Sequence, residues 1–172
     1  LDFTGTTATV GFDFTFTTAT NYYVYLRYSL FENNGNITNY GNEDSVFVGS
    51  NWNVIAGANW ETFDVSTYGS NSAASGGWEG LYHWGQVMLR TGMSTVGRVE
   101  TMILPVTDAD LGNPLTLNLR TREAGFSLDY ILLSPENNLN QTQLDYLAMI
   151  PEPSTIALLC AGVLLFACRR RA

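Results

Sequence analysis

The chain has 172 residues, of which 45% are apolar and 14% charged, and its 16 acidic and 8 basic residues give a formal net charge of −8. A chain with this balance can bury a core, which excludes a disordered acidic tail, and its length suits one domain with a further segment. The sequence contains no lysine, and residues 1–150 carry 5 arginines against 15 acidic residues, a balance that excludes nucleic-acid binding.

Short runs of alternating apolar and polar residues, the period of a half-buried β-strand, extend to about residue 140. The predicted strands lie at residues 10–16, 22–31, 46–48, 86–89, 96–106, 115–120 and 126–133. The 16 glycines and many Asn, Thr and Ser residues suit the turns between them. The pattern predicts an all-β domain over residues 1–135, an antiparallel β-sandwich of the jelly-roll type.

Aromatic residues gather in the middle of the chain. The candidates for a binding surface are Trp52, Trp78, Tyr82 and Trp84, with the acidic Glu79 between them. Aromatic rings stack on the apolar faces of sugars while neighbouring polar groups bond the hydroxyls, so these residues predict a carbohydrate-binding surface. Burial in the core is the alternative for Trp84. Trp78 follows two glycines in the low-complexity stretch 66–80, so among these aromatic residues it is the one that we most expect to be exposed to solvent.

Acidic residues form two candidate metal-binding sites in the sequence. The run 108–113 has oxygen donors at alternate positions, which suits calcium, but Leu119 stands where an EF-hand requires a glutamate, so a solvated turn is favoured. Asp129 interrupts the last apolar strand and can either bind a metal or pair with Arg120 or Arg122. We favour the ion pair.

The sequence gives little support for catalysis. His83, the single histidine, lies between two aromatic residues with no nucleophile motif nearby. No local sequence signature indicates the pair of catalytic carboxylates that glycosidases use. We therefore expect a domain that is not an enzyme.

The last residues differ in composition from the rest. A polar linker is predicted over residues 136–150, followed by a transmembrane helix over residues 154–168, within which residues 155–168 carry no charge. Those 14 residues would extend about 21 Å as a helix, which is short beside a hydrocarbon core of roughly 30 Å. The arginines that follow can snorkel and place the C-terminus on the cytoplasmic side. Both cysteines lie in this run, so no cysteine-based metal site or disulfide is expected before residue 150.

The segment 151–172 resembles the PEP-CTERM protein-sorting signal of Gram-negative bacteria. The resemblance rests on Pro151, Glu152 and Pro153, on the apolar run, and on Arg169, Arg170 and Arg171. It implies recognition and cleavage by exosortase, association with the inner membrane before processing, and export to the cell envelope, cell surface or extracellular matrix. Such proteins are often associated with exopolysaccharide and biofilm. A hydrophobic helix packed on the body would explain the apolar run but not the arginines.

A second resemblance covers residues 22–135. A strand containing Arg27, the pair Asp44-Ser45, the hairpin 122–125 and a final strand with Asp129 are similar in order to a galactose-binding-like jelly roll of carbohydrate-binding modules. The resemblance implies polysaccharide as a ligand and a structural calcium ion. Asp129 and Asp2 are the candidate metal ligands on that basis.

The sequence thus predicts an exported cell-envelope protein, processed by exosortase, whose β-sandwich binds polysaccharide without catalysis. One alternative is a structural matrix or biofilm protein without a ligand. Another is the accessory module of a truncated glycoside hydrolase. Because the chain begins with Leu1 rather than Met, we expect a fragment or processed form, and the catalytic part of that hydrolase would precede Leu1.

Overall fold

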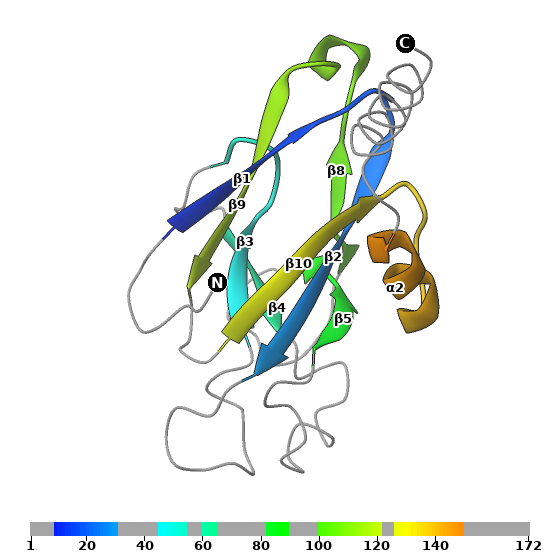
Figure 1. Ribbon diagram of the computed structural model, residues 1–172. Helices are drawn as coiled ribbons and strands as arrows, with labels where there is room; N and C mark the ends of the chain where they lie inside the picture. Colours follow the sequence, from blue (N-terminus) through cyan, green and yellow to red (C-terminus); the bar gives the residue numbers. More distant parts are fainter. Residues whose placement is uncertain are drawn as a thin grey trace, which may run out of the picture. The chain divides into compact units, whose positions relative to one another are not determined.

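The computed structural model describes residues 9–30, 45–54, 60–64, 82–89, 100–121 and 126–149. Within these ranges the chain forms antiparallel β-sheets and one α-helix (Figure 1). Two compact units divide at residue 138, and the first contains all of the strands. The predicted antiparallel β-structure is therefore confirmed.

The first sheet has the strand order β1-β9-β3-β4. Its strands are β1 (Thr9–Thr15), β9 (Pro114–Thr121), β3 (Ser45–Gly49) and β4 (Trp60–Asp64). In β1 the aromatic residues alternate with polar ones, so Phe12 and Phe14 face one side while Asp13 faces the other. Strand β4 was not among the strands predicted from the sequence.

The second sheet is built around β2 (Asn21–Leu30). Strand β10 (Phe126–Ser134) pairs along one edge of β2. The other edge carries two partners in succession, β8 (Ile103–Pro105) beside Asn21–Tyr23 and β5 (His83–Gln86) beside Tyr25–Tyr28.

Between these two partners, the chain leaves the second sheet. Strands β6 (Met88–Leu89) and β7 (Glu100–Thr101) pair with each other. At the point of departure the Val87 N–H donates to the Val24 carbonyl at 2.9 Å, and the Met102 N–H donates to the Val87 carbonyl at 3.1 Å. The stretch 96–106, predicted as one strand, is accordingly divided between β7 and β8.

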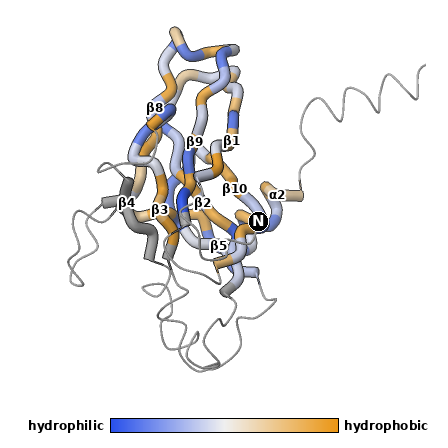
Figure 2. Tube along the Cα trace, turned by 90° about the vertical axis from the view of Figure 1, so that its left-hand side faces the viewer, coloured by the Kyte–Doolittle hydropathy of each residue, from blue (hydrophilic) through white to orange (hydrophobic). Residues whose placement is uncertain are grey.

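Buried side chains from both sheets pack into one apolar core. Its members are Val24, Leu26, Tyr28, Val46, Val48, Val87, Met102, Leu104, Leu117, Leu119, Phe126 and Leu128. Figure 2 shows hydrophobic residues, in orange, interspersed with hydrophilic ones, in blue, along the strands. Each such side chain contributes about 1.5–3 kcal/mol when fully buried, so the shared core is the main reason that the two sheets stay together. One face of the second sheet points into this core, and the opposite face, called here the outer face, carries Arg27.

The second unit contains α2 (Gln141–Met149), which forms in the segment predicted as a polar linker. Its start is fixed by a reciprocal cap: the Gln143 N–H donates to Asn140 Oδ1 at 3.0 Å, and the Asn140 N–H donates to Gln143 Oε1 at 2.9 Å. In the described part of the chain, no helix combines the length and apolarity needed to cross a membrane. The predicted transmembrane helix over residues 154–168 lies outside that part.

Candidate functional site: an aromatic and charged cluster on the outer face

Aromatic and charged side chains gather on the outer face of the second sheet. The register aligns Tyr130 of β10 with Arg27 of β2 and Arg27 with Trp84 of β5, so the three residues form one row across the sheet. Asp129 and Tyr82 adjoin this row. We call Arg27, Tyr82, Trp84, Asp129 and Tyr130 the outer-face cluster.

A β-bulge places Asp129 beside Arg27. The pairing of β10 with β2 passes from Leu128 opposite Tyr28 directly to Tyr130 opposite Arg27, which leaves Asp129 as the extra residue. Arg27 Nη1 donates to Asp129 Oδ2 at 2.7 Å, and the two side chains are 39% and 40% exposed. An ion pair this exposed contributes at most about 1 kcal/mol to stability, so its position on the surface is more informative than its energy.

The ion pair favoured for Asp129 forms, and its partner is Arg27. Arg120 places its guanidinium over the ring of Phe47, with Cζ 4.6 Å from the ring centre. Arg122 lies outside the described residues. The bulge brings Asp129 next to the one cation of the neighbouring strand.

The Tyr82 ring lies near the guanidinium of Arg27, and the rings of Trp84 and Tyr130 contact each other. The Arg27 Cζ atom is 5.9 Å from the centre of the Tyr82 ring, and the Tyr82 hydroxyl is hydrogen-bonded to Ser127 Oγ at 3.1 Å. Trp84 and Tyr130 meet edge to face, with ring centres 5.7 Å apart and planes at 68°. Trp84 is only 4% exposed and Tyr130 is 41% exposed. The buried indole thus packs against the exposed phenol ring.

The guanidinium of Arg27 keeps unused donor capacity. Its Nε atom is buried and has no hydrogen-bond partner among the residues that the structure describes. A guanidinium has five N–H donors, and the bond to Asp129 uses one at Nη1. The cluster therefore places an exposed aromatic ring, a partly exposed guanidinium donor and a carboxylate acceptor within one surface.

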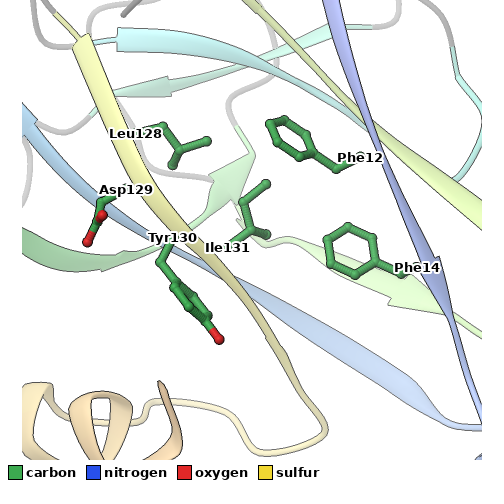
Figure 3. A pocket seen from close by; sticks show the side chains of 6 residues that line it. All are labelled: Phe12, Phe14, Leu128, Asp129, Tyr130 and Ile131. Atoms are coloured by element: carbon green, nitrogen blue, oxygen red, sulfur yellow. The ribbon is translucent and has the colours of Figure 1, made fainter. Parts of the chain in front are cut away.

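A shallow hollow of about 320 Å³ adjoins the cluster at the edge of β10. It is lined by Phe12, Phe14, Leu128, Asp129, Tyr130 and Ile131. Figure 3 shows Leu128 and Ile131 on the side of β10 that faces the two phenylalanines of β1, while Asp129 and Tyr130 project on the other side. Most of the residues that line the hollow are apolar, and its charged group is the Asp129 carboxylate.

Trp52 does not belong to this cluster. Its indole Nε1 donates to the Pro105 carbonyl at 2.8 Å, and its ring lies 6.3 Å from that of Phe14 and 5.3 Å from that of Phe16. Its own N–H donates to Asn51 Oδ1 at 2.8 Å. The indole therefore ties a turn to the end of the second sheet, which is a packing role.

The other residues predicted to bind sugar or metal either lie in the outer-face cluster or fall outside the described ranges. Tyr82, Trp84 and Asp129 come together in the cluster, whereas Trp78, Glu79 and Asp2 lie outside the described residues. Arg27 and Tyr130 were not among the predicted binding residues. The available signal was that Arg27 and Asp129 are the single charged residues of their strands and have opposite signs.

No group of three or more His, Cys, Asp or Glu side chains able to hold a metal ion occurs in the described ranges. In the turn before β9, residues Asp108–Asp110 form a 3-10 helix. Asp110 Oδ2 accepts hydrogen bonds from the Thr107 hydroxyl at 2.6 Å and from the Thr107 N–H at 2.8 Å. These bonds, the hydroxyl first, hold the pKa of Asp110 below its ordinary value of 3.8 because they stabilise the carboxylate.

Comparison with known proteins places the C-terminal segment. Residues 150–171 match the family model of the PEP-CTERM protein-sorting motif, and this range contains Pro151, Glu152, Pro153, Arg169, Arg170 and Arg171. No curated protein and no solved structure matches the chain. The chain therefore carries a PEP-CTERM sorting signal and is an exported protein of the cell envelope that exosortase processes.

Proposed function

We propose that the first unit is a jelly-roll sandwich of the galactose-binding-like kind that binds polysaccharide without catalysis, and that exosortase processing delivers it to the surface of a Gram-negative cell. Before processing, residues 154–168 would anchor the chain in the inner membrane, with Arg169 to Arg171 on the cytoplasmic side. The mature domain would then connect the cell surface or its matrix to exopolysaccharide.

The outer-face cluster carries this proposal. Tyr130 offers a ring that is 41% exposed, next to the half-exposed pair of Arg27 and Asp129. Sugars need an apolar platform together with donors and acceptors for their hydroxyls. Trp84 would act as a support for Tyr130 and not as a contact, because it is itself buried.

A structural matrix protein without a ligand is the second candidate, and one observation favours it. Two of the predicted aromatic contacts have packing roles, since Trp84 is buried and the Trp52 indole N–H bonds to a backbone carbonyl. Under this alternative, the side chains of the cluster would only pack on the outer face of the sheet and would bind no ligand.

Affinity electrophoresis of the full chain in detergent micelles separates the two candidates. The gels would contain neutral or acidic polysaccharides, each with calcium or with EDTA. Tyr130→Ala removes the exposed ring of the cluster, and Tyr146→Ala is the matched control because Tyr146 is an exposed tyrosine of α2. Retardation by one polymer, lost only with Tyr130→Ala, supports binding. A folded chain that no polymer retards contradicts it and leaves the matrix protein.

Processing is tested in cells with and without exosortase. The expected result is a loss of mass from the C-terminal segment only when exosortase is present, and its abolition by replacing Pro151, Glu152 and Pro153 with alanine. A chain cleaved equally in both strains would show that another protease acts on this segment.

A further inference from the structure

The pair of Arg27 and Asp129 holds a donor and an acceptor at one point of the surface. Both side chains are about two-fifths exposed, and their bond joins Nη1 to Oδ2. A guanidinium only donates hydrogen bonds and a carboxylate only accepts them. Two adjacent hydroxyls of a sugar ring can match such a pair, since one accepts from the guanidinium while the other donates to the carboxylate.

We propose that this pair binds vicinal hydroxyls of a neutral sugar, with the sugar ring seated against Tyr130, and that uronic acids are excluded. The proposal rests on the polysaccharide-binding function proposed above and names its substrate class. Tyr82 would hold the guanidinium in position, because its ring lies 5.9 Å from Arg27 Cζ and its hydroxyl is tied to Ser127.

Charge argues against an acidic sugar. A uronate could engage Arg27 only next to Asp129, or by displacing it, and either arrangement brings two carboxylates together. Residues 1–150 carry 5 arginines and 15 acidic residues, a formal net charge of −10. A field of this sign lowers the local concentration of anionic polymers. A neutral polymer meets neither penalty.

Charge also argues that calcium does not bridge the sugar to Asp129. The Asp129 carboxylate is already paired with a cation at 2.7 Å, and a calcium ion bound there would face the guanidinium of Arg27. Calcium sites gather six to eight oxygen ligands, and Asp129 is the one acidic residue among those of the outer-face cluster. Binding at this point should therefore not depend on calcium.

The test compares two polymers with the same backbone, polygalacturonate and the neutral galactan obtained by reducing its carboxyl groups, with dextran and mannan as further neutral probes. The full chain in detergent micelles is analysed with calcium and with EDTA. We expect retardation by at least one neutral polymer, none by polygalacturonate, and no effect of EDTA. Asp129→Asn and Arg27→Lys should each weaken binding about tenfold, the scale of one charge-assisted hydrogen bond, and Tyr146→Ala should not.

The outcomes separate the two proposals. Binding of polygalacturonate that is lost on reduction, or binding abolished by EDTA, overturns the neutral-sugar proposal but leaves polysaccharide binding intact. Unchanged affinity in Asp129→Asn also overturns it. Absence of binding to every polymer, for a chain that unfolds cooperatively, overturns both proposals. Asp129→Asn preserves shape and removes only a surface charge, so the test does not depend on whether Arg27→Lys folds.

Discussion

Gly11 of β1 lies so close to Thr116 of β9 that a Cβ atom at position 11 would stand 2.8 Å from Thr116 Cγ2. Thr116 cannot easily rotate away, because its hydroxyl donates to Asp13 Oδ1 at 2.6 Å. The same Cβ would also stand 3.2 Å from Asn118 Oδ1. The first sheet therefore uses a glycine to let two neighbouring strands keep a side-chain hydrogen bond between them.

Gly11→Ala is expected to destabilise the domain by about 1–3 kcal/mol, the usual cost of forcing extra volume into a packed contact. Urea unfolding would measure the loss. In the Gly11→Ala background, Thr116→Ser should recover part of it, because serine keeps the hydroxyl for Asp13 and removes the obstructing methyl group. Equal losses with threonine and serine at position 116 would show that the methyl group is not the obstacle.

Trp84→Ala should destabilise the domain by about 3–5 kcal/mol, because a buried indole leaves a large cavity. Trp84→Phe keeps a ring against Tyr130 and should cost clearly less. Tyr130→Ala removes a ring that is partly in solvent and should cost less than Trp84→Ala. Chemical unfolding of the three variants gives the order. A Trp84→Ala variant as stable as the parent would disprove the supporting role of this residue.

Asn53 has a left-handed backbone, with φ at 59°. Its N–H donates to the Thr116 carbonyl at 2.8 Å, and its Oδ1 accepts from the Thr116 N–H at 3.0 Å. Alanine loses the acceptor and tolerates this backbone poorly, so Asn53→Ala should cost about 1–2 kcal/mol or more. Asn53→Asp keeps the acceptor and should be the mildest change, with Asn53→Gly between the two. Thermal unfolding would reveal any other order.

The hydrogen bonds to Asp110 make part of the stability depend on pH. Its pKa is lowered in the folded chain, so the stabilisation is fully present above the ordinary value of 3.8 and is lost as the pH falls through the lowered value. Unfolding of the parent and of Asp110→Asn should therefore be measured across this acidic range. The difference in stability between them should shrink as the pH falls. A constant difference would mean that ionisation of Asp110 is not linked to folding.

Alternation of apolar and polar residues was enough to predict β9, whose leucines point into the shared core, while β2 and β10 were predicted from their apolar runs. The division of residues 96–106 was not predictable, since it depends on Met102 bonding to Val87 from a distant part of the sequence. The partner of Asp129 was missed for a similar reason. Pairing it with Arg27 requires the register of β10 on β2 and the position of the bulge, and both arise from packing between distant segments.

The roles of the tryptophans also required the tertiary structure. Composition places four of them in the middle of the chain, but whether a ring is exposed depends on which neighbour covers it. Trp84 is covered and its neighbour Tyr82 is only partly so. The cluster was therefore predicted in part, through Tyr82, Trp84 and Asp129.

The bond from Met102 to Val87 has a practical consequence for protein engineering. The chain leaves and re-enters the edge of β2 at one point, so the alignments of β5 and β8 are each set by β2 and not by the length of chain between them. Doubling a loop costs only about 0.6 kcal/mol in closure entropy. A peptide inserted between β6 and β7 would therefore begin and end at the paired residues Leu89 and Glu100, and its length would leave the alignment of β5 and β8 on β2 unchanged.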